Sequence, residues 1–271
     1  MTAYAWPAIF ALVVWWASTG LVLFLDGLPR RTFPRSMIGA SVVAAAAIAG
    51  VVASRDNATA AGAYLAFSCG VLAWGWHEMS FLMGYVTGPR RTACRRGCGG
   101  WPHFVHAVQA ILHHEIAILA TAAVLVALTW GAPNPVAAWT FVLLWLMRVS
   151  AKLNLFLGVR NPGIEFLPPH LGYLASYFRQ RACNALFPFS LAATVAVLAW
   201  LVGGASAVQA SAFETTAFGL LAALVALGVL EHVFLVWPWP VAKLWSWSFR
   251  SRGSVDDVGT GPAAIAKRCA P

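Results

Sequence analysis

The chain has 271 residues, of which 60% are hydrophobic and only 10% charged, and its formal net charge is +9. Soluble globular domains carry about 25% charged residues, so this composition excludes an ordinary soluble domain and predicts a polytopic membrane protein. The basic residues fall in short loops rather than in one stripe, which argues against a nucleic-acid-binding protein.

A transmembrane helix needs roughly 20 consecutive apolar residues. Seven stretches qualify, and they cover residues 5–25, 37–53, 60–85, 104–130, 136–157, 184–202 and 213–236. The first is too long for the apolar region of a signal peptide and has no basic residues before it, so we expect it to remain as a span. None shows the alternating pattern of barrel strands, so the predicted fold is an all-α bundle of about seven transmembrane helices.

The loops that these spans define differ sharply in charge. Seventeen of the eighteen lysines and arginines fall on one side of the membrane, and Arg55 alone falls on the other. Cytoplasmic loops carry the excess of basic residues. The predicted orientation therefore has a periplasmic N-terminus and a cytoplasmic C-terminus.

The predicted organisation is one transmembrane domain over residues 1–250 and a mobile cytoplasmic tail over 251–271. Between the fifth and sixth spans, LGYLASYF spaces Leu, Tyr and Phe as one face of a short interfacial helix. After the last span, VWPWPVAKLWSWSF is typical of a tryptophan-rich anchor at the membrane interface.

Polar residues interrupt several of the apolar stretches. The third span contains WGWHEMSF, the fourth ILHHE, the fifth LWLMRVSAKLNLF and the seventh LEHVF. All seven histidines fall in the half of the protein nearer the cytoplasm, and charged groups inside a bilayer nearly always face the bundle interior or a wet cavity. We therefore expect a shared site.

Three interpretations of that site remain open. The first is an ion-paired polar core that includes Arg148, Lys152, Asn154 and Asp26. The second is a site for iron, zinc or manganese, because imidazoles and carboxylates are ligands of such metals. Its candidate ligands are His77, Glu78, His113, His114, Glu115, Glu231 and His232. The third makes His77, between Trp74 and Trp76, the axial ligand of a bacteriochlorophyll-type pigment or a haem.

A second group of candidate ligands lies in TACRRGCGGWPHFVH. Cys94, Cys98, His103 and His106 give the spacing C-x3-C-x4-H-x2-H, which departs from the usual zinc spacing. The surrounding arginines are expected to repel a cation and to lower the thiol pKa values. Free thiols in a basic loop are the prediction here, because an odd cysteine count also argues against a disulfide framework.

Long blocks of the chain resemble the PuhE family of photosynthetic complex assembly proteins. They are WWASTGLVLFLDGLPRRTFPRSM, GAYLAFSCGVLAWGWHEMSFLMGYVTGPRRTAC, HAVQAILHHEIAILATAAVLVALTWG, LWLMRVSAKLNLFLGVRNPGIEFLPPHLGYLASYF and LEHVFLVWPWP. The resemblance implies a multi-pass protein in the inner membrane of a phototrophic bacterium. Its implied partners are subunits of the reaction centre and light-harvesting complex, with an influence on bacteriochlorophyll supply. No catalytic residues can be carried over.

Two functions follow as hypotheses. The first is a non-enzymatic assembly factor for the reaction centre and core light-harvesting complex, with the lipid bilayer and those subunits as partners and no nucleic acid. The second is a membrane metalloenzyme, in which the His and Glu cluster acts on a lipophilic pigment, isoprenoid or quinone. The sequence contains no Gly-rich phosphate loop and no nucleophile elbow, so nucleotide chemistry has no support.

Overall fold

The computed structural model describes residues 2–95, 97–237 and 239–252, and within these ranges it contains helices but no β-strand. The α-helices in the described ranges are α1 (Thr2–Asp26), α2 (Phe33–Ser54), α3 (Ala60–Leu82), α4 (Gly100–Thr129), α5 (Val136–Leu157), α6 (Phe187–Ala205) and α7 (Ala212–Val236). Short 3-10 helices lie in the connections, among them η2 (Ile164–Phe166), η3 (Pro169–Tyr177), η4 (Val241–Trp245) and η5 (Ser248–Arg252). The predicted all-α bundle is thus confirmed.

Six of the helices are long and apolar enough to cross a membrane, namely α1, α2, α4, α5, α6 and α7. At about 1.5 Å per residue, the 23 residues of α3 also reach across the hydrocarbon layer. Its mean hydropathy is reduced by the polar and aromatic residues of WGWHEMSF. That α3 is a seventh span therefore stays a prediction.

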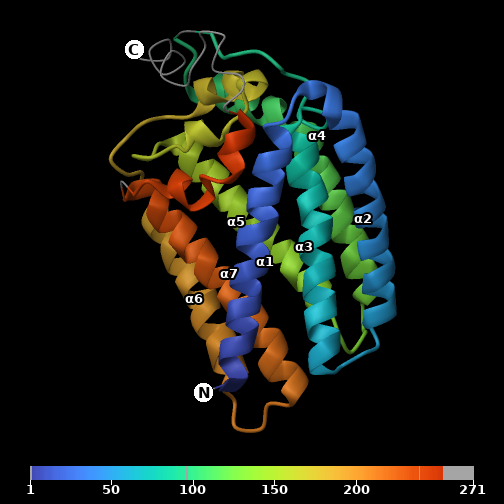
Figure 1. Cartoon of the computed structure of the whole chain (residues 1–271). Coiled ribbons are helices and arrows are strands. Elements are labelled where there is room, and N and C mark those ends of the chain that lie inside the picture. The colour runs from blue at the N-terminus through green and yellow to red at the C-terminus, as the bar shows by residue number, and fades with distance from the viewer. Residues whose placement is uncertain (1, 96, 238, 253–271) are drawn as a thin grey trace.

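Helix α3 lies in the middle of the bundle and packs against α1, α2, α5 and α7 (Figure 1). Small residues allow this close approach. At Gly70, an added Cβ would lie 2.8 Å from the Ala137 carbonyl oxygen of α5 and 2.9 Å from Thr140. The helix that carries His77 and Glu78 is thus shielded by its neighbours on most sides.

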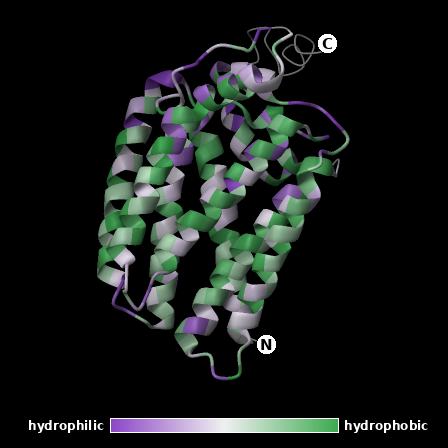
Figure 2. Cartoon of the chain, turned by 180° about the vertical axis from the view of Figure 1, so that it is seen from behind, coloured by the Kyte–Doolittle hydropathy of each residue, from purple (hydrophilic) through white to green (hydrophobic). Residues whose placement is uncertain are grey.

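The main apolar core joins α3, α4, α5 and α7. Phe67, Ile118, Leu125, Phe141 and Leu220 are fully buried within it. Figure 2 shows apolar residues along the length of the helices, with hydrophilic residues concentrated in the connections at the two ends.

Several helix ends differ by three or four residues from the approximate ends of the predicted spans. Helix α4 begins at Gly100 rather than at residue 104. Helix α3 ends at Leu82 rather than at residue 85, because Gly84 adopts a φ of +82° and turns the chain. Helix α6 begins at Phe187, because Asn184 Oδ1 accepts hydrogen bonds from the backbone N–H groups of residues 186 and 187. Side-chain capping of this kind fixes helix starts that hydropathy does not mark.

The predicted interfacial helix in LGYLASYF is present as the 3-10 helix η3. Its apolar residues Leu171, Leu174 and Tyr177 are buried in a cluster with Phe81 of α3 and Ala110 of α4. The helix therefore covers the end of the bundle with the same face that was predicted to lie on lipid.

The tryptophan-rich segment after α7 folds back onto α1. Trp245 is buried, its Nε1–H donates to the Trp16 carbonyl oxygen at 3.0 Å, and Trp16 Nε1–H donates to the Leu244 carbonyl oxygen at 3.0 Å. Trp237 and Trp239 remain exposed, as a membrane anchor requires.

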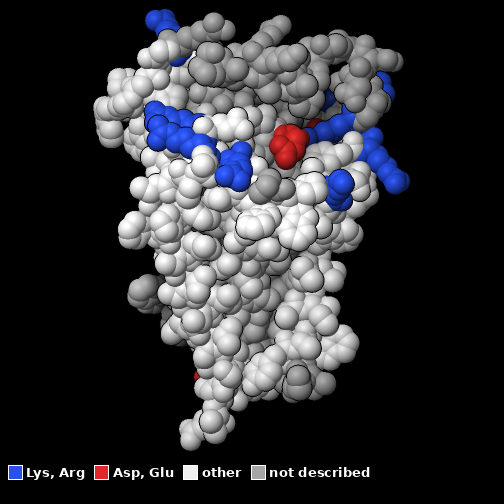
Figure 3. Space-filling model, turned by 90° about the vertical axis from the view of Figure 1, so that its left-hand side faces the viewer, with Lys and Arg blue, Asp and Glu red and all other residues white. Residues whose placement is uncertain are grey.

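The described chain starts and ends at opposite ends of the bundle. Arg252 Nη2 donates to Asp26 Oδ1 at 2.7 Å, at the end of α1 opposite to Thr2. Figure 3 shows Lys and Arg gathered toward one end of the face in view, which is the asymmetry that predicted the orientation. The assignment of that end to the cytoplasm stays a prediction, and most of the predicted mobile tail (residues 253–271) lies outside the described residues.

The close contact between α3 and α5 makes a stability prediction. Gly70→Ala is expected to lower the free energy of unfolding by about 1–3 kcal/mol, because its Cβ has no room beside Ala137. Gly75→Ala on the same helix is the matched control: a Cβ there meets nothing within 4 Å, so higher helix propensity should stabilise it by up to about 1 kcal/mol. Thermal unfolding in detergent measures both, and equal effects would contradict the packing.

Candidate functional site

Helix α5 supplies two cations, Arg148 and Lys152, which lie one helical turn apart on the same face. Arg148 pairs with Glu78 of α3: its Nε donates to Glu78 Oε1 at 3.2 Å, and its Nη2 donates to Oε2. This bidentate geometry is the strong form of the Arg–carboxylate pair. It ties α3 to α5.

Lys152 pairs with Glu115 of α4 through a 2.6 Å contact between Nζ and Oε1. The other oxygen of Glu115 accepts a hydrogen bond from Trp145 Nε1–H at 3.3 Å, and Lys152 Nζ lies 5.8 Å from the centre of the Phe81 ring. The two ion pairs together join α3 and α4 to one face of α5.

Two imidazoles meet beside these ion pairs. The rings of His77 on α3 and His114 on α4 are 6.5 Å apart, centre to centre, and both are buried. His77 Nε2 forms a 3.0 Å hydrogen bond with Thr121 Oγ1, whereas the Nδ1 atoms of both histidines have no hydrogen-bond partner among the described residues. Buried nitrogens without a partner are unusual in folded proteins, so this pair is the best-placed part of the predicted metal site.

The other predicted metal ligands are placed differently. His232 on α7 uses both ring nitrogens: Nδ1 bonds the Gly228 carbonyl oxygen at 2.8 Å, and Nε2 bonds Ser150 Oγ at 2.8 Å. Because a carbonyl only accepts, Nδ1 carries the proton and Nε2 accepts from the serine hydroxyl. His113 is exposed on α4, and Glu231 is exposed on α7 although its charge acts on Arg148 together with those of Glu78 and Glu115.

Asn154 and Asp26, which were predicted to share the polar core, serve separate contacts. Asn154 is fully buried; its Nδ2 donates to Ser190 Oγ of α6 at 3.0 Å, and its Oδ1 accepts from Asn184 Nδ2 at 3.0 Å. Asp26 pairs with Arg252 at the end of α1. Asn154 thus fixes α6, and Asp26 fixes the C-terminal segment.

The aromatic residues beside His77 in the sequence pack against other helices of the bundle. Trp74 is buried with its ring 5.5 Å from that of Phe141, and Trp76 Nε1–H donates to Ser41 Oγ of α2 at 3.0 Å. The rings of Trp76 and His77 are 5.1 Å apart. The pigment hypothesis, like the metal hypothesis for the His and Glu cluster, stays a prediction.

The sequence spacing of the second group of candidate ligands did not indicate that they lie close together. Cys94, Cys98 and His106 each place one ligand atom within 4.8 Å of the other two. Burial and the neighbouring Cys98 raise the pKa of the Cys94 thiol, and Arg90 only partly opposes this. The arginines thus act in the expected direction on the pKa of the Cys94 thiol, but burial and Cys98 outweigh them.

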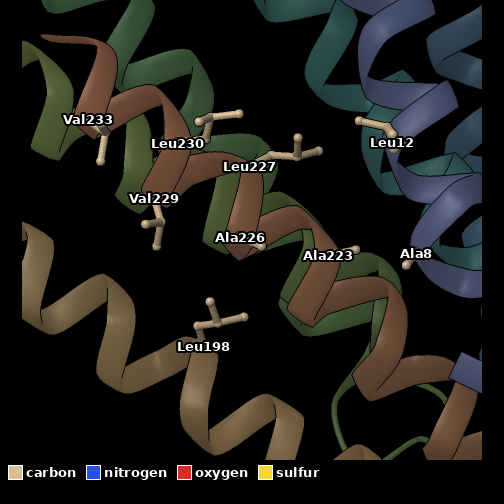
Figure 4. Close-up of a pocket in the computed structure, with 9 residues that line it drawn as sticks. All are labelled: Ala8, Leu12, Leu198, Ala223, Ala226, Leu227, Val229, Leu230 and Val233. Carbon is tan, nitrogen blue, oxygen red and sulfur yellow. The ribbon is translucent and has the colours of Figure 1, made fainter. Parts of the chain in front are cut away.

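An apolar groove of about 540 Å³ lies between α1, α6 and α7 (Figure 4). Ala8 and Leu12 of α1 lie on one side of α7, and Leu198 of α6 lies on the other. The remaining lining residues belong to α7 and are Ala223, Ala226, Leu227, Val229, Leu230 and Val233. Only apolar residues line it.

The pair of Glu78 and Arg148 makes a quantitative prediction. Glu78→Leu leaves Arg148, whose side chain is 45% exposed at the surface of the bundle, without its partner in the predicted membrane layer. This is expected to cost about 3 kcal/mol of unfolding free energy. Glu78→Leu/Arg148→Leu should recover most of that loss, because it removes both charges. Asp56→Ala, in the exposed pair Arg55–Asp56, is the control and should cost less than about 1 kcal/mol. Unfolding in mixed detergent micelles measures all three, and a double variant no better than Glu78→Leu would contradict the pairing.

Comparisons with known proteins agree over most of the chain. A 30.4 kDa protein of Rhodobacter capsulatus, described as uncharacterized and encoded in the 5′ region of puhA, is 38% identical over 249 residues, which are 90% of this chain and 90% of that protein. No solved structure matches the chain. The family described as "Protein of unknown function (DUF3623)" matches residues 1–256. The chain therefore belongs to the DUF3623 family.

Proposed function

We propose that this protein is an integral membrane assembly factor for the photosynthetic reaction centre and its core light-harvesting complex, in the inner membrane of a phototrophic bacterium. The observation that carries the proposal is the 38% identical relative encoded beside puhA, in a photosynthesis gene region. The alignment covers 90% of both chains, so the whole membrane bundle is shared rather than one segment. The resemblance of the chain to PuhE assembly proteins points to the same role.

The groove between α1, α6 and α7 suits a transmembrane helix of a partner subunit. Ala8, Ala223 and Ala226 present small side chains along it, and small residues let helix backbones approach closely within a membrane. The apolar lining also matches the apolar surface of a subunit helix that has been inserted into the bilayer but not yet joined to its complex. The occupant that we propose is a newly inserted subunit helix of the photosynthetic complex.

The basic end of the protein offers a second contact for such partners. Arg91 and Arg95 are exposed in the connection between α3 and α4, and Arg160 and Arg181 are exposed between α5 and α6. Clusters of basic residues next to transmembrane helices attract anionic lipid and acidic protein surfaces. Under the proposed orientation these loops meet the cytoplasmic parts of the partner subunits.

A metalloenzyme acting on a lipophilic pigment, isoprenoid or quinone is the second candidate. One observation favours it: the Nδ1 atoms of His77 and His114 are buried and lack hydrogen-bond partners among the described residues. Against it, Glu78 and Glu115 are engaged with Arg148 and Lys152, which leaves those carboxylates less free to bind iron, zinc or manganese. Metal that remains in Cys94→Ser/Cys98→Ser but is lost on His77→Gln would favour the enzyme.

The assembly role is tested in a phototrophic host that lacks its own copy of the gene. We expect deletion to lower the amount of assembled reaction-centre and core light-harvesting complex severalfold, as measured by membrane absorption spectra and native gels. Complementation with Ala226→Trp, which fills the groove, should restore little of it. Val42→Trp, at an exposed site on α2 away from the groove, should restore it fully.

The assembly role and the groove as docking site are contradicted by different results. Normal assembly in the deletion strain would overturn the assembly role. Full rescue by Ala226→Trp, with the variant present at wild-type level in the membrane, would overturn the groove as the docking site.

A further inference from the structure

The connection between α3 and α4 and the first turns of α4 bring together two thiols and two imidazoles. Cys98 Sγ lies 3.5 Å from His106 Nδ1, Cys94 Sγ lies 3.7 Å from the same atom, and His103 Nδ1 lies 3.2 Å from Cys94 Sγ. In a tetrahedral zinc site, bonds of about 2.3 Å to sulfur and 2.0–2.1 Å to nitrogen place sulfur and nitrogen ligands about 3.5 Å apart. The three distances fall around this value, and one ligand atom each from Cys94, Cys98 and His106 lies within 4.8 Å of the other two. His103, which contacts Cys94, lies outside this group of three.

We propose that Cys94, Cys98, His103 and His106 form a structural zinc site. The inference is independent of the proposed assembly function, because it rests on the ligand geometry alone. His103 and His106 are three residues apart on α4 and so project from one face of the helix, toward the cysteine-bearing loop. Cys94, Cys98 and His106 are already grouped, and a small movement of His103, which contacts Cys94, would complete the set. Two cysteines and two histidines are the closed ligand set of structural rather than catalytic zinc.

The surroundings hold the ligands in place. The Cys94 backbone N–H donates to Ser176 Oγ at 2.9 Å, and Tyr177 Oη donates to the Thr92 carbonyl oxygen at 2.8 Å, so η3 fixes the loop just before the first ligand. The His103 ring stacks on Phe156, with ring centres 5.3 Å apart, and its ring centre lies 5.8 Å from that of Tyr177. Outer contacts of this kind orient the histidine ligands of metal sites.

The charge of the neighbouring arginines does not oppose zinc binding at this site. The nearby arginines would repel a free cation, but Zn²⁺ bound by two thiolates and two neutral imidazoles has no net charge. Under the predicted orientation the site faces the cytoplasm, where cysteines stay reduced and disulfides are rare. The bound zinc would order the arginine-bearing loop between α3 and α4.

Metal analysis of the full chain tests the proposal. Protein expressed with zinc and purified in detergent should hold about one zinc ion per chain. Cys94→Ser/Cys98→Ser and His106→Ala should each lose most of it. Cys183→Ser and His113→Ala remove an exposed cysteine and an exposed histidine outside the cluster, and both should keep the full zinc content.

A cobalt titration of the wild-type chain, stripped of metal with a chelator, decides the matter without any variant. Thiolate-bound tetrahedral cobalt gives intense visible bands and a sulfur-to-metal charge-transfer band, and added zinc should abolish both. Wild-type protein without zinc and without these bands would overturn the proposal. So would zinc retained by a folded Cys94→Ser/Cys98→Ser variant, or a Cys94–Cys98 disulfide in protein from the reducing cytoplasm.

Discussion

The bundle depends on the pairing of charges that the membrane does not solvate. Helix α5 presents Arg148 and Lys152 one turn apart, and each meets a carboxylate from a different helix, Glu78 of α3 or Glu115 of α4. An unpaired charge at that depth costs several kcal/mol, so only arrangements that satisfy both pairs are stable. The two pairs therefore select how α3, α4 and α5 are rotated against one another, which apolar packing alone specifies weakly.

This constraint is consistent with the enclosed position of the helix that carries His77 and Glu78. Helix α3 carries His77 and Glu78, and it packs against α1, α2, α5 and α7, with glycine at the closest approach to α5. The enclosure leaves the lipid-facing surfaces of the outer helices apolar, among them the groove between α1, α6 and α7.

Hydropathy and the location of polar residues predicted the helices and identified Glu78, Glu115, Arg148 and Lys152 as members of one charged network. They could not predict the pairing, because helix rotation depends on side-chain contacts between segments far apart in the sequence. Hence two adjacent residues have different partners: Glu78 pairs with Arg148, and His77 hydrogen-bonds to Thr121. For the same reason, the sequence spacing of Cys94, Cys98 and His106 did not predict that they lie close together. The turn at Gly97, with a φ of +79°, and the helix start at Gly100 bring these ligands together.

The most direct test of this account is a charge exchange between α4 and α5. Glu115→Lys and Lys152→Glu each place two like charges together and are expected to prevent accumulation of folded protein in the membrane. The exchanged variant Glu115→Lys/Lys152→Glu restores an ion pair, and we expect it to recover much of the wild-type unfolding free energy in detergent. Single variants as stable as the wild type, or an exchanged variant that loses as much as the two single variants combined, would contradict the account.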